Sequence, residues 1–80
     1  MDSKLTLNDL PLNIKANILS VECKENLINR MYDFGIIKNG EIIPIYRSPF
    51  GDPTAYLVKN AIVALRADDC KKITVTPIKS

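Results

Sequence analysis

The sequence contains no histidine, and its two cysteines, Cys23 and Cys70, lie far apart in the chain. Proteins hold transition metals mainly through imidazole, thiolate or clustered carboxylate groups, so we expect no metal site. Without histidine, neither a Ser/His/Asp nor a Cys/His catalytic set can form. No GxxxxGK[ST] phosphate loop is present either. These absences predict a binding protein that is not an enzyme and that carries no cofactor.

Long hydrophobic runs are also missing. The longest apolar run, Ala61–Leu65, is far too short to span a bilayer, so no direct membrane insertion is expected. The start of the chain, Met1–Leu5, lacks the charged and apolar segments of a signal peptide. Two distant cysteines do not resemble the dense disulfide framework of small secreted domains. We therefore expect a reduced, cytoplasmic protein that reaches a membrane only through a partner.

The charge balance is weak, with eleven Lys and Arg residues against nine Asp and Glu residues. The signs are mixed along the chain, since Asp68 and Asp69 come shortly before Lys71 and Lys72. No basic stripe with interleaved aromatic residues is present, so no nucleic-acid partner is expected. We interpret the acidic pair as the solvated start of a short helix rather than as a cation site.

What is present suits one small globular domain over residues 1–80, because 46% of the residues are hydrophobic and 25% are charged. The segment Glu25–Phe34 has the spacing of an amphipathic helix, and Gly35 is placed to end it. Arg30 and Asp33 lie three residues apart and can pair on its surface. The four apolar residues expected to be buried are Leu27, Ile28, Met31 and Phe34.

Alternating and β-branched segments surround this helix. We expect Leu5–Pro11 to form a turn, and Pro44 to mark an open side or a bulge in its strand. The first predicted strand starts at Ile14 and has Ile14, Ala16 and Ile18 on one face. The others cover residues 41–47, 54–59, 62–65 and 73–76, with a short helical turn at 67–70. Five short strands around one main helix predict a mainly β fold, a small, partly open β-barrel of SH3-like size.

The loop Ser48–Pro53 is the best candidate for a binding surface. Pro49 and Pro53 stiffen it and Gly51 permits a sharp bend, while Phe50 is large and apolar. Phe50 can either fold back to cap an open end of the barrel or stay exposed as a contact residue. The residues proposed to bind a partner are Arg47, Ser48, Pro49, Phe50, Gly51, Asp52 and Pro53, with Arg30 and Asp33 on the helix.

Several motifs resemble those of the ferrous iron transport protein A (FeoA) family. Arg30–Ile36 is similar to its helix-end motif, and Gly40 fills the position of the next family glycine. Ser48–Pro53 is similar to its Ala-Pro-Leu-Gly-Asp-Pro loop. Leu65-Arg66, Cys70 and Ile73 match its Leu-Arg, Ala and Ile at the same spacing, so we expect Cys70 to be a small core residue.

The sequence departs from the family at Asn13, where a glycine is usual, and at Asn60, in place of a glycine-containing hairpin. Asparagine tolerates positive φ, so both can keep the family backbone. The resemblance implies an SH3-like barrel that assists ferrous iron uptake by binding the cytosolic domain of the membrane transporter FeoB. The alternative is a free-standing SH3-like module, associated with peptide or DNA and related to the C-terminal domain of iron-dependent repressors.

Overall fold

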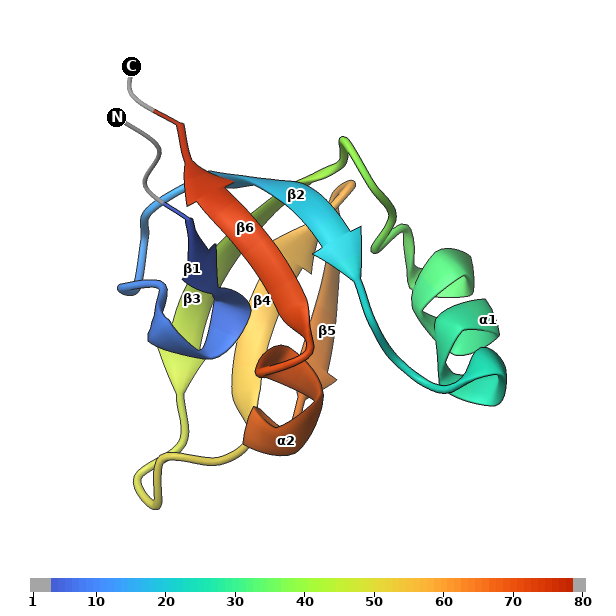
Figure 1. Cartoon of the computed structure of the whole chain (residues 1–80). Helices are drawn as coiled ribbons and strands as arrows, with labels where there is room; N and C mark the ends of the chain where they lie inside the picture. Colours follow the sequence, from blue (N-terminus) through green and yellow to red (C-terminus); the bar gives the residue numbers. More distant parts are fainter. Residues whose placement is uncertain (1–3, 79–80) are drawn as a thin grey trace.

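The computed structural model describes residues 4–78. The segment Met1–Ser3, which belongs to the stretch where no signal peptide is expected, lies outside these residues. Six strands, one main helix and two shorter helical segments follow one another along the chain (Figure 1). Their bounds are β1 Leu5–Thr6, η1 Leu7–Asp9, β2 Ala16–Val21, α1 Glu25–Phe34, β3 Glu41–Arg47, β4 Thr54–Val58, β5 Ala61–Leu65, α2 Ala67–Cys70 and β6 Ile73–Pro77.

The six strands form one antiparallel sheet in the order β1-β6-β2-β3-β4-β5. The sheet curves strongly but does not close, so β1 and β5 are its edges (Figure 1). The predicted mainly β fold with one main helix is confirmed. The sheet has one strand more than the five expected, because Leu5–Thr6 pairs with Val75 and Thr74 of β6 before the chain turns into η1. A two-residue strand shows no alternation of its own, and this one depends on a distant partner.

The core lies inside the curved sheet, where alternate side chains of β2, β4 and β6 are buried. Ile14 was expected to share the buried face of β2, but it precedes the strand and is 40% exposed. The turn before β2 instead places Asn13 N–H against the Pro44 carbonyl at 2.6 Å. The buried apolar residues include Leu7, Leu10, Ala16, Ile18, Ile42, Tyr56, Val58, Ile73 and Val75.

The backbone confirms three expectations about turns and irregularities. Asn13 and Asn60 adopt φ values of 68° and 67°, so both take the left-handed conformation that glycine would favour. The pairing of β3 with β4 shifts its register between Pro44 and Tyr46. A bulge at this place is consistent with proline, which has no N–H to donate to the ladder.

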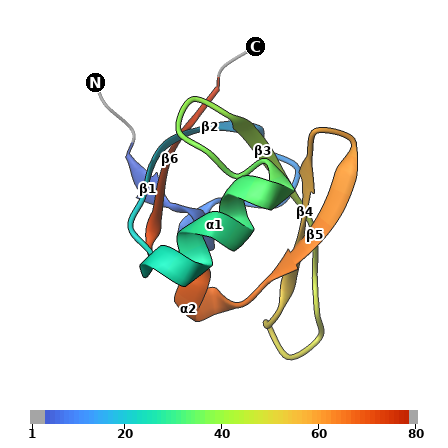
Figure 2. The same cartoon turned by 90° about the vertical axis from the view of Figure 1, so that its right-hand side faces the viewer.

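Helix α1 has the predicted bounds, and Gly35 ends it with φ 90° while its N–H bonds to the carbonyls of the last turn. Its packing differs from the expectation. Met31 is buried, but Ile28 is 38% exposed and Phe34 is 41% exposed. The helix projects from one side of the sheet (Figures 1 and 2), so only part of its apolar face meets the core.

Candidate binding surface

The loop between β3 and β4 is held by hydrogen bonds within itself. Ser48 Oγ donates to the Asp52 carbonyl at 2.9 Å, and Ser48 N–H donates to the Pro53 carbonyl at 3.1 Å. Gly51 N–H returns to the Ser48 carbonyl at 2.7 Å, and Gly51 takes φ 85° to allow this turn. The loop therefore has a fixed shape that does not depend on the side chain at position 50.

Phe50 is 96% exposed at the end of this loop, so the capping interpretation is wrong. The neighbouring end of the sheet is already covered by η1 and α2, which contact one another and bury Leu7, Leu10 and Cys70. Full exposure of a phenylalanine leaves its apolar surface in water, which is unfavourable unless something else covers it. The loop thus presents one large apolar side chain on a turn that is closed by its own hydrogen bonds.

The two charged residues beside Phe50 have structural contacts of their own. Asp52 Oδ1 accepts a hydrogen bond from Ala67 N–H at 2.9 Å, which satisfies a free donor at the start of α2. Arg47 Nε donates to Thr54 Oγ1 at 3.3 Å. Asp52 therefore anchors the loop to α2, a link that sequence reasoning missed because fifteen residues separate the two partners.

Arg30 and Asp33 do not join the loop. Both lie on α1, at the side of the molecule away from residues 48–53 (Figure 1). They also do not pair with each other, because the one ion pair between residues 4 and 78 joins Lys15 Nζ to Glu41 Oε1 at 3.4 Å. The structure thus brings seven of the nine candidate residues together and places the other two on a separate surface.

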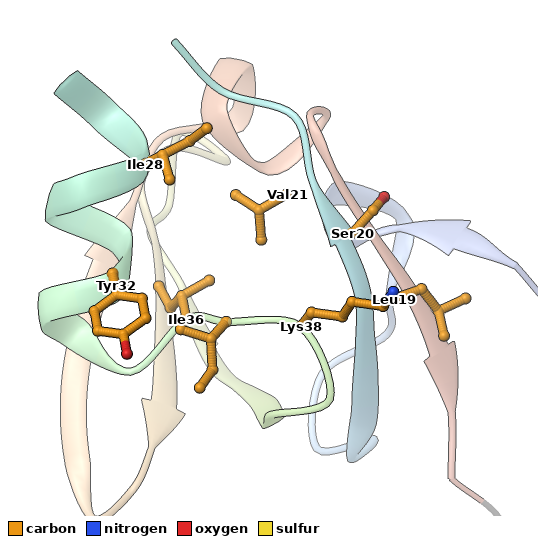
Figure 3. Close-up of a pocket in the computed structure, with 8 residues that line it drawn as sticks. Leu19, Ser20, Val21, Ile28, Tyr32, Ile36 and Lys38 are labelled. Carbon is orange, nitrogen blue, oxygen red and sulfur yellow. The ribbon is translucent and has the colours of Figure 1, made fainter. Parts of the chain in front are cut away.

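A groove that sequence reasoning missed lies between α1, the end of β2 and the segment 36–38. Its volume is about 470 Å³, and Ile28 and Val21 point toward one another across it (Figure 3). Tyr32, on the same helix, is 68% exposed. The sequence contained one signal of this groove. The apolar stripe of α1 includes more residues than the core buries, since Met31 is the only buried residue of the helix.

The thiol of Cys70 is buried and lies 3.2 Å from the hydroxyl of Tyr56. Burial raises the pKa of Cys70 to about 11, although the hydrogen bond with Tyr56 acts in the opposite direction. Burial also raises the pKa of Cys23, with a smaller contribution from the nearby Asp69 carboxylate. Both shifts favour the protonated thiols. Because Cys70 is buried, it is the small core residue that was expected.

Within residues 4–78, no three cysteine, aspartate or glutamate side chains lie close enough together to share a metal ion. In the same range, no helix is long and apolar enough to cross a membrane. The groups available at the surface of this part of the chain include the exposed rings of Phe50, Tyr32 and Tyr46, the edges of the sheet at β1 and β5, and charged side chains. Such groups are suited to contacts with another macromolecule.

Known proteins resemble this chain over most of its length. "Putative Fe(2+) transport protein A" of Campylobacter jejuni is 34% identical over 74 residues, which cover 92% of this chain and 100% of that protein. The FeoA structure from Chlorobium tepidum has a TM-score of 0.89 at 21% identity, covering 94% of this chain and 71% of that one. The zinc complex of Stenotrophomonas maltophilia FeoA, described as a prokaryotic SH3 domain protein, has a TM-score of 0.77 at 28% identity and covers 89% and 88%.

The same SH3-like fold occurs in a manganese-dependent transcriptional repressor, with a TM-score of 0.85 at 13% identity. This chain is covered to 98%, but it spans only 44% of the repressor, so the likeness concerns the fold of one part of that protein. The sequence model of the FeoA domain matches residues 5–77. The chain therefore belongs to the FeoA domain family.

Proposed function

We propose that this protein is a cytoplasmic accessory protein of ferrous iron uptake, which binds the cytosolic domain of an FeoB-type membrane transporter through the loop 48–53. Membership of the FeoA family and the similarity to a protein named for Fe(2+) transport support the link to iron uptake. Transport itself belongs to the partner, and this chain acts by contact.

The observation that carries the proposal is the 96% exposure of Phe50 on a loop whose shape is fixed by its own hydrogen bonds. Large aromatic side chains that enter a pocket of the partner contribute most to the affinity of small interfaces. Because the loop is already ordered, little conformational entropy is lost when it binds. Phe50 is therefore the anchor of the contact.

The charged neighbours of Phe50 form the rim of this contact. Arg47 uses its Nε for Thr54, which holds the guanidinium beside the loop. Asp52 uses one carboxylate oxygen for Ala67 N–H, which fixes the loop against α2. An apolar anchor surrounded by polar groups is the usual arrangement of a binding site, since the rim excludes water from the anchor.

Replacing Phe50 by serine tests the proposal. Phe50→Ser removes no buried contact, so the melting temperature should stay within a few degrees of the parent. Binding to the purified cytosolic domain of the transporter, measured by calorimetry, should weaken at least tenfold, about 1.4 kcal/mol.

Leu12→Ser is the matched control, because Leu12 is another exposed apolar residue outside this loop, 39% exposed. It should leave the affinity unchanged. Equal binding by Phe50→Ser and the parent would show that the loop is not the interface.

A further inference from the structure

The free edge of β5 lines a groove. β5 pairs with β4 alone, so its other edge is unpaired. The consecutive residues Ala61–Ala64 line one cavity of about 370 Å³, and Ala64–Arg66 line a second of about 270 Å³. Consecutive strand residues point alternately to the two faces of a sheet, so cavities lined by all of them follow the backbone edge. The other side of both cavities is lined by residues of α1, joined at the second by Asp69 of α2.

The hairpin geometry identifies which backbone groups face this groove. The turn Lys59-Asn60 has two residues at positive φ, 48° and 67°, as in a tight two-residue hairpin, and Val58 pairs with Ala61. In such a hairpin the residues that flank the turn exchange hydrogen bonds, and every second residue does so along the ladder. The N–H and C=O groups of Ile62 and Ala64 therefore point away from β4, toward the groove.

The charges at the two ends of the groove are opposite. Arg30 and Arg66 line the end near Leu65, together with Asp69, so this end carries one net positive charge. Asp33 lines the other end, near Ala61. No ion pair within residues 4–78 involves any of these four side chains.

We propose that this groove binds an extended peptide segment of another protein, which adds a strand to the edge of β5. Unpaired strand edges are the usual templates for such addition, and the ladder supplies hydrogen bonds for any sequence. Selectivity comes from the walls: the half-exposed Phe34 favours an apolar residue, and the guanidinium groups of Arg30 and Arg66 favour a carboxylate at their end.

A second copy of the chain fits this edge less well than a peptide. Because α1 runs beside the edge as the second wall, a strand that enters must lie between β5 and α1. A single extended segment has one strand's width, whereas β5 of another copy would bring its own helix with it. The site is independent of Phe50, so it does not rest on the function proposed above.

The test uses a seven-residue peptide of alternating valine and threonine with glutamate at one end and lysine at the other, and the same peptide in reversed order. Amide spectra of the whole ¹⁵N-labelled chain are recorded as each peptide is added. We expect the amides of Ile62 and Ala64 to shift most, and one order to bind at least fivefold more tightly. Absence of shifts along β5, or equal binding of the two orders, would overturn the proposal.

Ala64→Pro removes a groove-facing N–H and leaves the bonds to β4 in place, so it should reduce binding at least tenfold. A peptide with N-methylated backbone makes the same test on the unaltered protein, and it should bind at least tenfold more weakly. Arg66→Glu should abolish the preference for one order, because both ends of the groove would then carry one net negative charge. Lys71→Glu, an equal charge change at an exposed residue outside the groove, should leave the preference in place.

Phe50→Ser should bind the peptide like the parent, which separates this site from the loop. Retained binding by Ala64→Pro and by the N-methylated peptide would overturn strand addition. Movement of the Ile62 and Ala64 amides on dilution without peptide would show that a second copy occupies the edge, and would also overturn the proposal.

Discussion

The sheet and helix α1 differ in how completely they bury their apolar residues. Ile18 of β2, Ile42 of β3 and Ile73 of β6 have no exposed surface. In α1, only Met31 is buried, although Ile28 and Phe34 belong to the same amphipathic pattern. The sheet thus carries the stability of the fold, and α1 serves mainly as a wall beside it, with a groove on each side.

The largest expected effect tests this difference between the sheet and α1 directly. Ile18→Ala should lower the free energy of unfolding by about 2–5 kcal/mol, because it removes buried methyl and methylene groups and leaves a cavity. Ile28→Ala, the same substitution on the half-exposed side of α1, should cost about 1 kcal/mol or less. Urea unfolding measures both, and equal losses would contradict the division between sheet and helix.

A second prediction concerns pH and the place where α2 packs on the sheet, since the buried Cys70 of α2 contacts Tyr56 of β4. The pKa of Cys70 is about 11 in the folded state against 9.0 for a free thiol, so the unfolded chain loses this proton first as the pH rises. The contribution of the Cys70 thiol to the free energy of unfolding is therefore fully present below pH 9. It falls by roughly 2–3 kcal/mol as the pH rises to about 11. Burial raises the pKa of Tyr56 too, which adds a loss of the same sign at higher pH.

Urea unfolding at pH 8 and pH 11 measures this loss, and Cys70→Ala should reduce the difference between the two pH values. A pH difference that is the same in Cys70→Ala and the parent would mean that the buried thiol is not its source.

The smallest expected effect concerns the attachment of α1. Gly35→Val places a β-branched side chain at φ 90°, which costs about 1–2 kcal/mol or more. Its Cβ would also lie 3.1 Å from Lys59 Cδ and 3.3 Å from Val58 Cγ1. Gly51→Val separates the two causes, because φ is 85° there and a Cβ would have nothing within 4 Å. Thermal unfolding should show the larger loss for Gly35→Val, and an unchanged melting temperature would contradict the cap.

Local patterns predicted the elements of this fold well. Hydrophobic spacing and Gly35 together gave both ends of α1, and the asparagines marked turns that need positive φ. The strand β1 was not predicted, because two residues are too few to show the alternation of apolar and polar side chains that marks a strand. Its pairing with β6 also joins positions about seventy residues apart.

Features that depend on the assembled molecule could not be predicted in this way. The spacing of Ile28 and Phe34 shows which face of α1 is apolar, but only the folded chain shows how little of that face the core covers. Whether Phe50 caps the sheet depends on η1 and α2, which come from distant parts of the sequence. The groove along β5 depends on strand order, which the sequence pattern leaves open.

The proposed contact between the loop 48–53 and the transporter's cytosolic domain is tested most directly by adding this unlabelled domain to the ¹⁵N-labelled chain and following the amide signals. We expect the signals of Ser48, Phe50 and Gly51 to weaken first, ahead of those of α1. Unchanged signals from this loop, while those of α1 or β5 weaken, would contradict the claim.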